Sequence, residues 1–350
     1  MGELLFVSGL GIGLFGVVTW GWKALPDESW QFLASIPVGK ADNGVWRGRN
    51  LTYYGALIAT AVVIATALMY VLMMATNMPL GGTLAIISLT LAVCVPSSKL
   101  VARIVEQKKH TSTSGGASFV GTLLAPWIIQ GTQTVCASQG AGHVPVMVVL
   151  AAGMTCYALG EGLGRLACIS FGCCYGKPLS QLCPWLKKVF ANYNFVFTGA
   201  TKKIAYASGL EGQQVVPVQA LTTVLYIGAG LTATLLFLWS RYVAAFLVAI
   251  LVTQMWRPVS ELLRADYRGG RTMSAYQVMG CVTVPYAMVL AWFFAYDAVP
   301  MANLTVGLKA LWNPLFVVLI ESLWGGIFVY FGWSTVTEST LLFHVRSEEI

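Results

Sequence analysis

The sequence predicts an all-α protein, built as a polytopic bundle of transmembrane helices. Hydrophobic residues make up 57% of the 350 residues, charged residues make up only 10%, and the mean hydropathy is +0.72. Apolar runs of about 20 residues, each long enough to cross a hydrocarbon layer of about 30 Å, recur along the chain. A soluble protein of this length does not require repeated apolar runs that are long enough to cross a membrane. We therefore expect an integral membrane protein.

The apolar runs divide the chain into three parts. We expect an N-terminal transmembrane helix and linker in residues 1–49, a core of about seven helices in 50–298, and an extra helix with a tail in 299–350. The first run has no basic start and no small-residue cleavage site before Trp20, which favours a retained helix over a signal peptide. The runs that predict spans lie near residues 3–22, 52–76, 79–98, 116–136, 144–170, 217–240, 242–263, 275–297 and 310–334.

A polar interval between two of these runs, residues 172–216, predicts a small cap outside the membrane. It contains five lysines and several aromatic residues, among them Trp185 and Tyr193. An interval of this length is usually folded or functional, because idle connections are short. The alternative interpretation is a variable surface loop.

The eight cysteines fall into two groups. Four lie inside predicted spans, where cysteine packs as a small apolar residue: Cys94, Cys136, Cys156 and Cys281. The other four gather around Arg165 at the expected membrane interface: Cys168, Cys173, Cys174 and Cys183. Because no C-x-x-C pair and no histidine lie nearby, we expect no metal site there, and either a disulfide or tight packing of small side chains.

Charged residues inside the apolar runs are the main functional signal. An arginine near the centre of a bilayer costs roughly 2.5–3.5 kcal/mol, so Arg165 and Arg257 indicate a functional site by default. Glu161 stands four residues before Arg165, and Glu261 stands four residues after Arg257. Helical spacing predicts that each pair shares one helix face, and intrahelical pairs that neutralise each other are the alternative to a functional site.

The charged cluster that begins at Arg257 extends further along the chain. Arg264 follows Arg257 at the seventh position, so we expect it on the same face of one helix, next to a basic loop that runs to Arg268 and Arg271. Guanidinium groups can hold phosphate through two parallel hydrogen bonds. Pro258 removes an N–H within this helix and predicts a kink. This group therefore predicts an anion site.

The motifs around these charges resemble, in order, those of the prolipoprotein diacylglyceryl transferase family over about residues 50–298. The matching segments are Asn50-Leu-Thr-Tyr-Tyr54-Gly55, Gly116-Ala-Ser-Phe-Val120-Gly121-Thr-Leu123, Gly164-Arg165 through Gly176, Pro217-Val218-Gln219, Arg257-x-x-x-Glu261-x-x-Arg264-x-Asp266, and Ser274-x-x-Gln277. The resemblance implies a membrane enzyme that moves a diacylglyceryl group from phosphatidylglycerol to a lipoprotein cysteine. It also implies the cytoplasmic membrane of a bacterium.

The chain departs from the family pattern at several polar positions. Val120 stands where the family has histidine, Cys168 where it has asparagine, Cys173 where it has glutamate, and Thr253 where it has tyrosine. The groups that could hold an anion are kept, whereas the groups that could handle a proton are changed. This pattern is typical of a divergent branch of the family.

The resemblance implies roles for the retained residues. Arg165 and Arg257 would hold the phosphate and stabilise the departing glycerol phosphate, Tyr54 would bind the same headgroup, and Glu261 would orient Arg257 or act as a base. Either Cys168 or Cys173 could instead serve as a nucleophile that carries the lipid. The remaining substrate-binding candidates are Arg264, Gly121, Gly176 and Gln219.

Two other function classes stay open at the level of sequence. A transporter of a small anion or lipid would use the same buried charges to line a pathway, although no repeat of the two halves is visible. A membrane thiol oxidoreductase would use the adjacent cysteines. Expected partners are phosphatidylglycerol, membrane lipids and a prolipoprotein or another membrane acceptor; no nucleic acid and no cofactor are expected.

The charge distribution conflicts with the orientation that the resemblance implies. The net charge is +7, and with nine spans only Arg241 and Lys309 of the 21 lysines and arginines fall on the side of the short loops. The positive-inside rule then places the site on the cytoplasmic side. The family resemblance implies the outer side, and basic residues near a phospholipid headgroup have their own electrostatic reason to gather there.

Overall fold

The computed structural model describes residues 1–107, 113–138, 145–267, 273–295 and 300–350 of the chain. Within these residues, eight helices are long and apolar enough to span a membrane, as the prediction of a polytopic helical bundle requires. They are α1 (Gly2–Ala24), α2 (Tyr53–Ala75), α3 (Leu80–Glu106), α5 (Val146–Phe171), α8 (Val218–Leu238), α9 (Tyr242–Leu262), α10 (Ala275–Phe293) and α12 (Pro314–Gly332).

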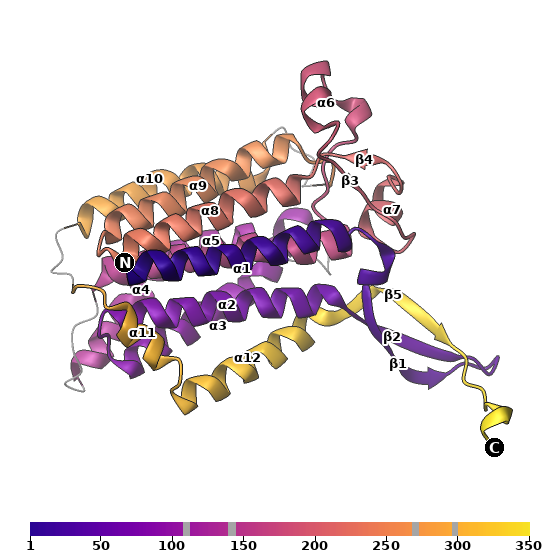
Figure 1. Cartoon of the computed structure of the whole chain (residues 1–350), viewed down its shortest axis with the longest axis horizontal. Coiled ribbons are helices and arrows are strands. Elements are labelled where there is room, and N and C mark those ends of the chain that lie inside the picture. The colour runs from indigo at the N-terminus through magenta and orange to yellow at the C-terminus, as the bar shows by residue number, and fades with distance from the viewer. Residues whose placement is uncertain (108–112, 139–144, 268–272, 296–299) are drawn as a thin grey trace.

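The ninth predicted span, 116–136, forms the helix α4 (Ser114–Ser138), which has 25 residues. This helix is long enough to cross a bilayer, but it is less apolar than the other eight, because it contains Gln130, Gln133 and Pro126. It packs against α3 and α10. The two chain ends lie at opposite ends of the bundle (Figure 1).

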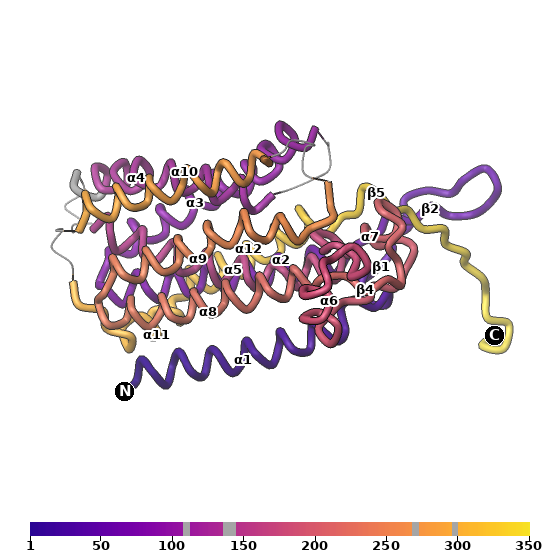
Figure 2. Tube along the Cα trace, turned by 90° about the horizontal axis from the view of Figure 1, so that it is seen from above, coloured from indigo at the N-terminus to yellow at the C-terminus, as the bar shows by residue number. Residues whose placement is uncertain are grey.

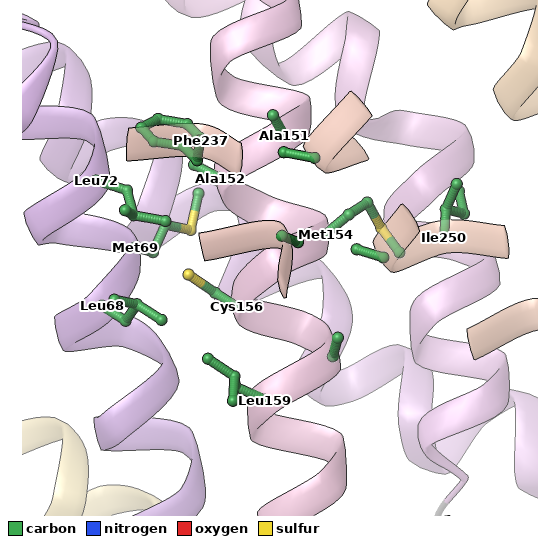
Figure 3. Close-up of a cluster of buried hydrophobic side chains, with 14 of the residues drawn as sticks. Leu68, Met69, Leu72, Ala151, Ala152, Met154, Cys156, Leu159, Phe237 and Ile250 are labelled. Carbon is green, nitrogen blue, oxygen red and sulfur yellow. The ribbon is translucent and has the colours of Figure 1, made fainter. Parts of the chain in front are cut away.

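The centre of the bundle is α5, the most buried of the candidate spans. Small residues let its neighbours α2 and α8 approach closely: a Cβ atom on Gly160 would lie 2.8 Å from the Cβ of Ala65, and one on Gly162 would lie 2.9 Å from Ile227. The surrounding core is apolar, and Figure 3 shows part of it, where Leu68, Leu159, Phe237 and Ile250 come from α2, α5, α8 and α9. Helix α1 flanks the bundle on the outside of α8 and α5 (Figure 2).

A three-stranded antiparallel sheet, which the sequence does not predict, lies at one end of the bundle (Figure 1). Its strands are β1 (Phe32–Lys40), β2 (Trp46–Thr52) and β5 (Trp333–Leu341), in that order. Since β2 leads into α2 and β5 follows α12, the sheet joins the first core helix to the last long helix. Thr52 Oγ1 donates to the Gly332 carbonyl oxygen at 2.9 Å, which fixes this junction.

The predicted cap lies at the same end of the bundle as the sheet (Figure 1). It contains the short helices α6 (Pro184–Phe190) and α7 (Lys203–Ser208) and the paired strands β3 (Phe195–Val196) and β4 (Gln214–Val215). At the opposite end, the short helix α11 (Leu304–Ala310) precedes α12 and packs against α2.

A buried lysine joins the cap to the bundle. The ammonium group of Lys202 donates to the carbonyl oxygens of Ser170 and Leu25, at 2.7 and 3.1 Å. Its side chain is fully buried, and burial lowers the pKa of Lys202 to about 8, although Asp27 and Glu28 oppose the shift. The lysine therefore ties the end of α1, the end of α5 and the cap together.

Candidate active site

A cavity of about 1110 Å³ lies among α2, α3, α5 and α9 and extends to β5. Its lining changes character along its length. Apolar side chains from α2 and α3, such as Ile58, Met69 and Leu91, line one part, whereas the charged groups of α5 and α9 line another. A cavity with this division suits an amphipathic ligand such as a lipid.

Arg165 lies on α5 with its guanidinium group facing the cavity. Its Nη2 forms an ion pair with Glu161, four residues earlier, as the helical spacing predicts. Ser114 Oγ, at the start of α4, donates to the same carboxylate at 2.6 Å. The ion pair therefore offsets the charge of Arg165, and the hydrogen bond from Ser114 links the central helix to α4.

Arg257 reaches the same cavity from α9. Its Nη2 donates to the Tyr157 hydroxyl at 2.5 Å, so its hydrogen-bonding partner is a neutral group on α5. Both arginines are only 9% exposed, and within the described chain the Nε–H of each is buried without a hydrogen-bond partner. Two buried guanidinium groups with unused donors make this region suited to an anion.

The end of α9 differs from the sequence prediction. The helix ends at Leu262, so Arg264 does not continue the face that carries Arg257. Arg264 instead pairs with Asp266, with Nε–Oδ1 and Nη2–Oδ2 distances of 2.7 and 3.0 Å. Burial disfavours the charge on Arg264, but the carboxylate of Asp266 raises its pKa above the ordinary value. Arg268 and Arg271 lie outside the described residues.

Glu261 lines the cavity and accepts a hydrogen bond from Ser274 Oγ at the start of α10. Ser274 also caps α10, together with Gln277, in a reciprocal capping box. Glu261 therefore connects the end of α9 to the beginning of α10. The sequence shows both residues, but not that they meet across two helices.

The other predicted site residues take different positions. Tyr54 lines the cavity, and its ring lies edge-on to Phe171 with the ring centroids 5.7 Å apart. Gln219 also lines it, and its Nε2 donates to the Cys173 carbonyl oxygen at 2.8 Å. Gly121 and Gly176 are not among the lining residues: added Cβ atoms would lie 2.7 Å from Cys94 Sγ and 2.3 Å from the Val216 carbonyl oxygen, respectively.

Three of the interface cysteines meet in space. The Sγ atoms of Cys168, Cys173 and Cys174 all lie within 4.8 Å of one another, and all three residues line the cavity. Cys183 is a separate, exposed residue of the cap. All four are free thiols, so of the two alternatives that the sequence leaves open, a disulfide or tight packing, the disulfide is not formed among them.

Several residues that shape the site are missing from the sequence prediction. Tyr157 could have been found, because it stands four residues before Glu161 and so shares the face of α5 that carries Arg165. Ser114 and Ser274 carry no signal in the sequence beyond their places near helix starts. Their partners become visible only once the helices are packed together.

The fold and the cavity define a multi-pass helical membrane protein with buried cationic groups at an amphipathic pocket. Compared with known protein families, residues 46–296 match the prolipoprotein diacylglyceryl transferase family. Because the match covers most of the chain, the protein belongs to this family of membrane transferases, which act on prolipoproteins. No curated protein and no solved structure matches the chain.

Proposed function

We propose that this protein takes the diacylglyceryl group from phosphatidylglycerol, transfers it to a thiol of a prolipoprotein or another membrane acceptor, and releases glycerol phosphate. The observation that carries the proposal is the pair of buried guanidinium groups, Arg165 and Arg257, which enter one cavity from two different helices. Each has a buried Nε–H that the described protein does not use.

The local charge balance supports an anionic phosphodiester as the ligand. Arg165 is offset by Glu161, whereas the hydrogen-bonding partner of Arg257 is the neutral hydroxyl of Tyr157. The carboxylate of Glu261 also lines the cavity but binds a serine at the start of α10, so within the described residues Arg257 has no carboxylate partner. A phosphodiester carries one negative charge, so its headgroup would neutralise a buried cation that is otherwise costly in an apolar interior.

The remainder of the cavity supports a lipid over a free anion. Ile58, Val62 and Met69 of α2 and Ile87 and Leu91 of α3 give it an apolar wall. Acyl chains placed against this wall would leave the glyceryl carbon and the phosphate near the charged groups. A small hydrated anion gains nothing from such a surface.

The reaction is a substitution at the glyceryl carbon that carries the phosphate. A sulfur–carbon bond forms with the acceptor thiol, the carbon–oxygen bond to phosphate breaks, and the thiol proton balances the charge on the released glycerol phosphate. Arg165 and Arg257 would stabilise the departing phosphate as its charge grows. Tyr54 would bind the headgroup, and Glu261 would hold the end of α9 in position through Ser274.

We place the protein in the cytoplasmic membrane of a bacterium, with the cap and sheet on the outer side. In this orientation the polar part of the cavity opens toward the face where a translocated acceptor emerges. The clustered basic residues at this end would then interact with anionic lipid headgroups.

The experiment that tests the proposal follows labelled acyl chains from phosphatidylglycerol in vesicles that contain the purified protein. A cysteine-containing lipoprotein-signal peptide and a membrane extract serve as acceptors. Arg257→Ala is expected to abolish both label transfer and glycerol phosphate release, whereas Arg241→Ala, which removes an exposed arginine at the other end of the bundle, is the matched control. Absence of glycerol phosphate with every acceptor would reject the transferase and favour transport.

A further inference from the structure

The three clustered cysteines are held by a specific backbone turn. Helix α5 ends at Phe171, and Gly172 takes a left-handed conformation with φ of 69°. The N–H of Cys173 then bonds back to the Cys168 carbonyl oxygen at 2.9 Å, which folds Cys173 over the last turn of the helix. This turn explains how two cysteines five positions apart come together without a C-x-x-C motif.

The third cysteine has an unusual backbone. Cys174 has a φ of 58°, a left-handed conformation that non-glycine residues rarely adopt and that costs about 1–2 kcal/mol. The chain on either side is fixed: Gln219 binds the Cys173 carbonyl oxygen, and Gly176 pairs with Arg264 in an antiparallel bridge. The strained conformation thus lies within a rigid segment that borders the cavity.

The surroundings of the cluster are cationic. Arg165, Lys203 and Arg264 are all close enough to interact electrostatically with one or more of the three sulfur atoms. Ligation to a metal ion itself favours the thiolate form of cysteine. Three thiolates with a divalent ion carry a net charge of −1, and because Arg165 and Arg264 are already paired with Glu161 and Asp266, Lys203 is the cation that would balance it.

The cavity also lacks an uncommitted group to accept a proton from an incoming thiol. No histidine is present among the described residues that line it. Each carboxylate in that lining already binds a neighbouring side chain: Glu106 accepts from Tyr276, Glu161 pairs with Arg165, Glu261 accepts from Ser274, and Asp266 pairs with Arg264.

From this arrangement we propose that Cys168, Cys173 and Cys174 bind a zinc ion whose fourth ligand position faces the cavity. Zinc takes cysteine ligands at about 2.3 Å in tetrahedral geometry, which separates the sulfur atoms by about 3.8 Å. The three Sγ atoms, all within 4.8 Å of one another, need only small side-chain adjustments to reach it. Zinc fits this ligand set better than a hard cation such as Mg²⁺, which prefers oxygen ligands.

The zinc site would activate the acceptor thiol, a step for which the cavity offers no uncommitted carboxylate among its described residues. This inference rests on the proposed function. Three protein ligands leave one position for an exogenous group, as in catalytic zinc sites. The acceptor thiol would bind there as the thiolate, because ligation to zinc favours that form, and its proton would leave with the released glycerol phosphate. Its sulfur would then attack the glyceryl carbon while Arg165 and Arg257 hold the departing phosphate, with no change in oxidation state.

The test measures metal binding directly and needs no transferase assay. The full-length protein, purified in detergent under reducing conditions, is expected to contain one equivalent of zinc by elemental analysis. After replacement of zinc with Co²⁺, it should show thiolate-to-cobalt charge-transfer absorption and the visible bands of a tetrahedral site. A cysteine peptide added to this form should change the visible bands as its sulfur takes the fourth position.

Single variants identify the ligands. Cys168→Ser, Cys173→Ser and Cys174→Ser should each lower cobalt affinity by more than the about 10-fold to 100-fold that loss of an outer-shell partner costs. Cys183→Ser removes an exposed thiol of the same cap and should bind cobalt as the wild type does. Because cobalt titration of the wild-type protein requires no variant, the proposal can be tested even if a substituted chain fails to fold.

Two results would overturn the zinc site. One is wild-type protein that binds neither Zn²⁺ nor Co²⁺, and the other is a thiol titration that finds a disulfide between two of the three cysteines in the active protein. The two proposals fail separately: active protein without metal would reject the zinc site alone, whereas zinc-loaded protein that leaves phosphatidylglycerol intact would reject the transferase alone.

Discussion

Replacing Tyr157 with phenylalanine tests how Arg257 is held. The substitution removes one oxygen atom, which accepts a hydrogen bond from Arg257 Nη2 at 2.5 Å, and leaves the ring in place on α5. Since Arg257 Nε–H already lacks a partner in the described chain, the variant would leave a second buried donor unsatisfied. The guanidinium group would then lose its link to the central helix.

The expected effect follows from the kind of bond that is lost. A hydrogen bond to a charged group contributes about 1.5–3 kcal/mol. If Tyr157 orients Arg257 for the transition state, this energy corresponds to a fall in kcat/KM of about 10-fold to 150-fold. The matched control is Tyr226→Phe, because Tyr226 also lines the cavity but its hydroxyl donates to the Thr253 carbonyl oxygen at 2.7 Å.

The assay is the initial rate of glycerol phosphate release from phosphatidylglycerol vesicles at a fixed concentration of acceptor peptide. An apparent melting temperature for each variant separates lost activity from lost folding. We expect Tyr157→Phe to be slow and folded, and Tyr226→Phe to keep most of the wild-type rate. A folded Tyr157→Phe protein with wild-type kcat/KM would refute the role given to this hydrogen bond.

Three further predictions concern the cap and its junction with the bundle. Raising the pH from about 8 to about 10.5 should stabilise the wild type relative to Lys202→Met by up to about 3 kcal/mol, because in this range Lys202 keeps its proton in the unfolded chain and loses it in the folded protein. A difference in melting temperature between the two proteins that does not change with pH would contradict this. Gly176→Ala should lower the free energy of unfolding by about 1–3 kcal/mol, because the added Cβ atom clashes with Val216. The control Gly228→Ala places its Cβ atom in open space and should be neutral, and equal melting temperatures for the two variants would exclude the clash. A membrane-impermeant maleimide should label exposed Cys183 in intact spheroplasts and lose that label in Cys183→Ser; labelling only after lysis would place the cap inside.

The transmembrane helices could be predicted from sequence because the bilayer imposes a length and an apolar composition on each of them. The three-stranded sheet could not be predicted from sequence. Strand β2 pairs with β5, from Trp46 with Leu341 to Leu51 with Trp333, and no local pattern connects segments so far apart in the chain. Strand β5 also directly follows the apolar run of α12, so its start is hidden in the hydropathy pattern.

The charged groups of the site were visible in the sequence because arginines are conspicuous in apolar runs, and the ion pair between Glu161 and Arg165 follows from helical spacing. The same rule misplaced Arg264, because α9 ends at Leu262. The contact between Arg257 and Tyr157 joins two helices and depends on how they pack. Spacing within one helix carries no information on such contacts.

The cysteine cluster shows a different limit of sequence reasoning. Motif spacing argued against a metal site, because Cys168 and Cys173 do not form a C-x-x-C pair. A left-handed glycine at the end of α5 reverses the chain and brings their sulfur atoms together with that of Cys174. The relevant distance is set by a helix-capping turn and not by the number of intervening residues.

The central claim is that this protein breaks the bond between the diacylglyceryl group and phosphate in phosphatidylglycerol and joins that group to a thiol. The most direct measurement is mass spectrometry of a cysteine-containing acceptor peptide after incubation with the purified protein and phosphatidylglycerol vesicles. The account predicts a peptide that carries a diacylglyceryl thioether, with an equal amount of glycerol phosphate, and neither product with Arg257→Ala. An unmodified peptide and intact phosphatidylglycerol, in the presence of folded and zinc-loaded wild-type protein, would contradict it.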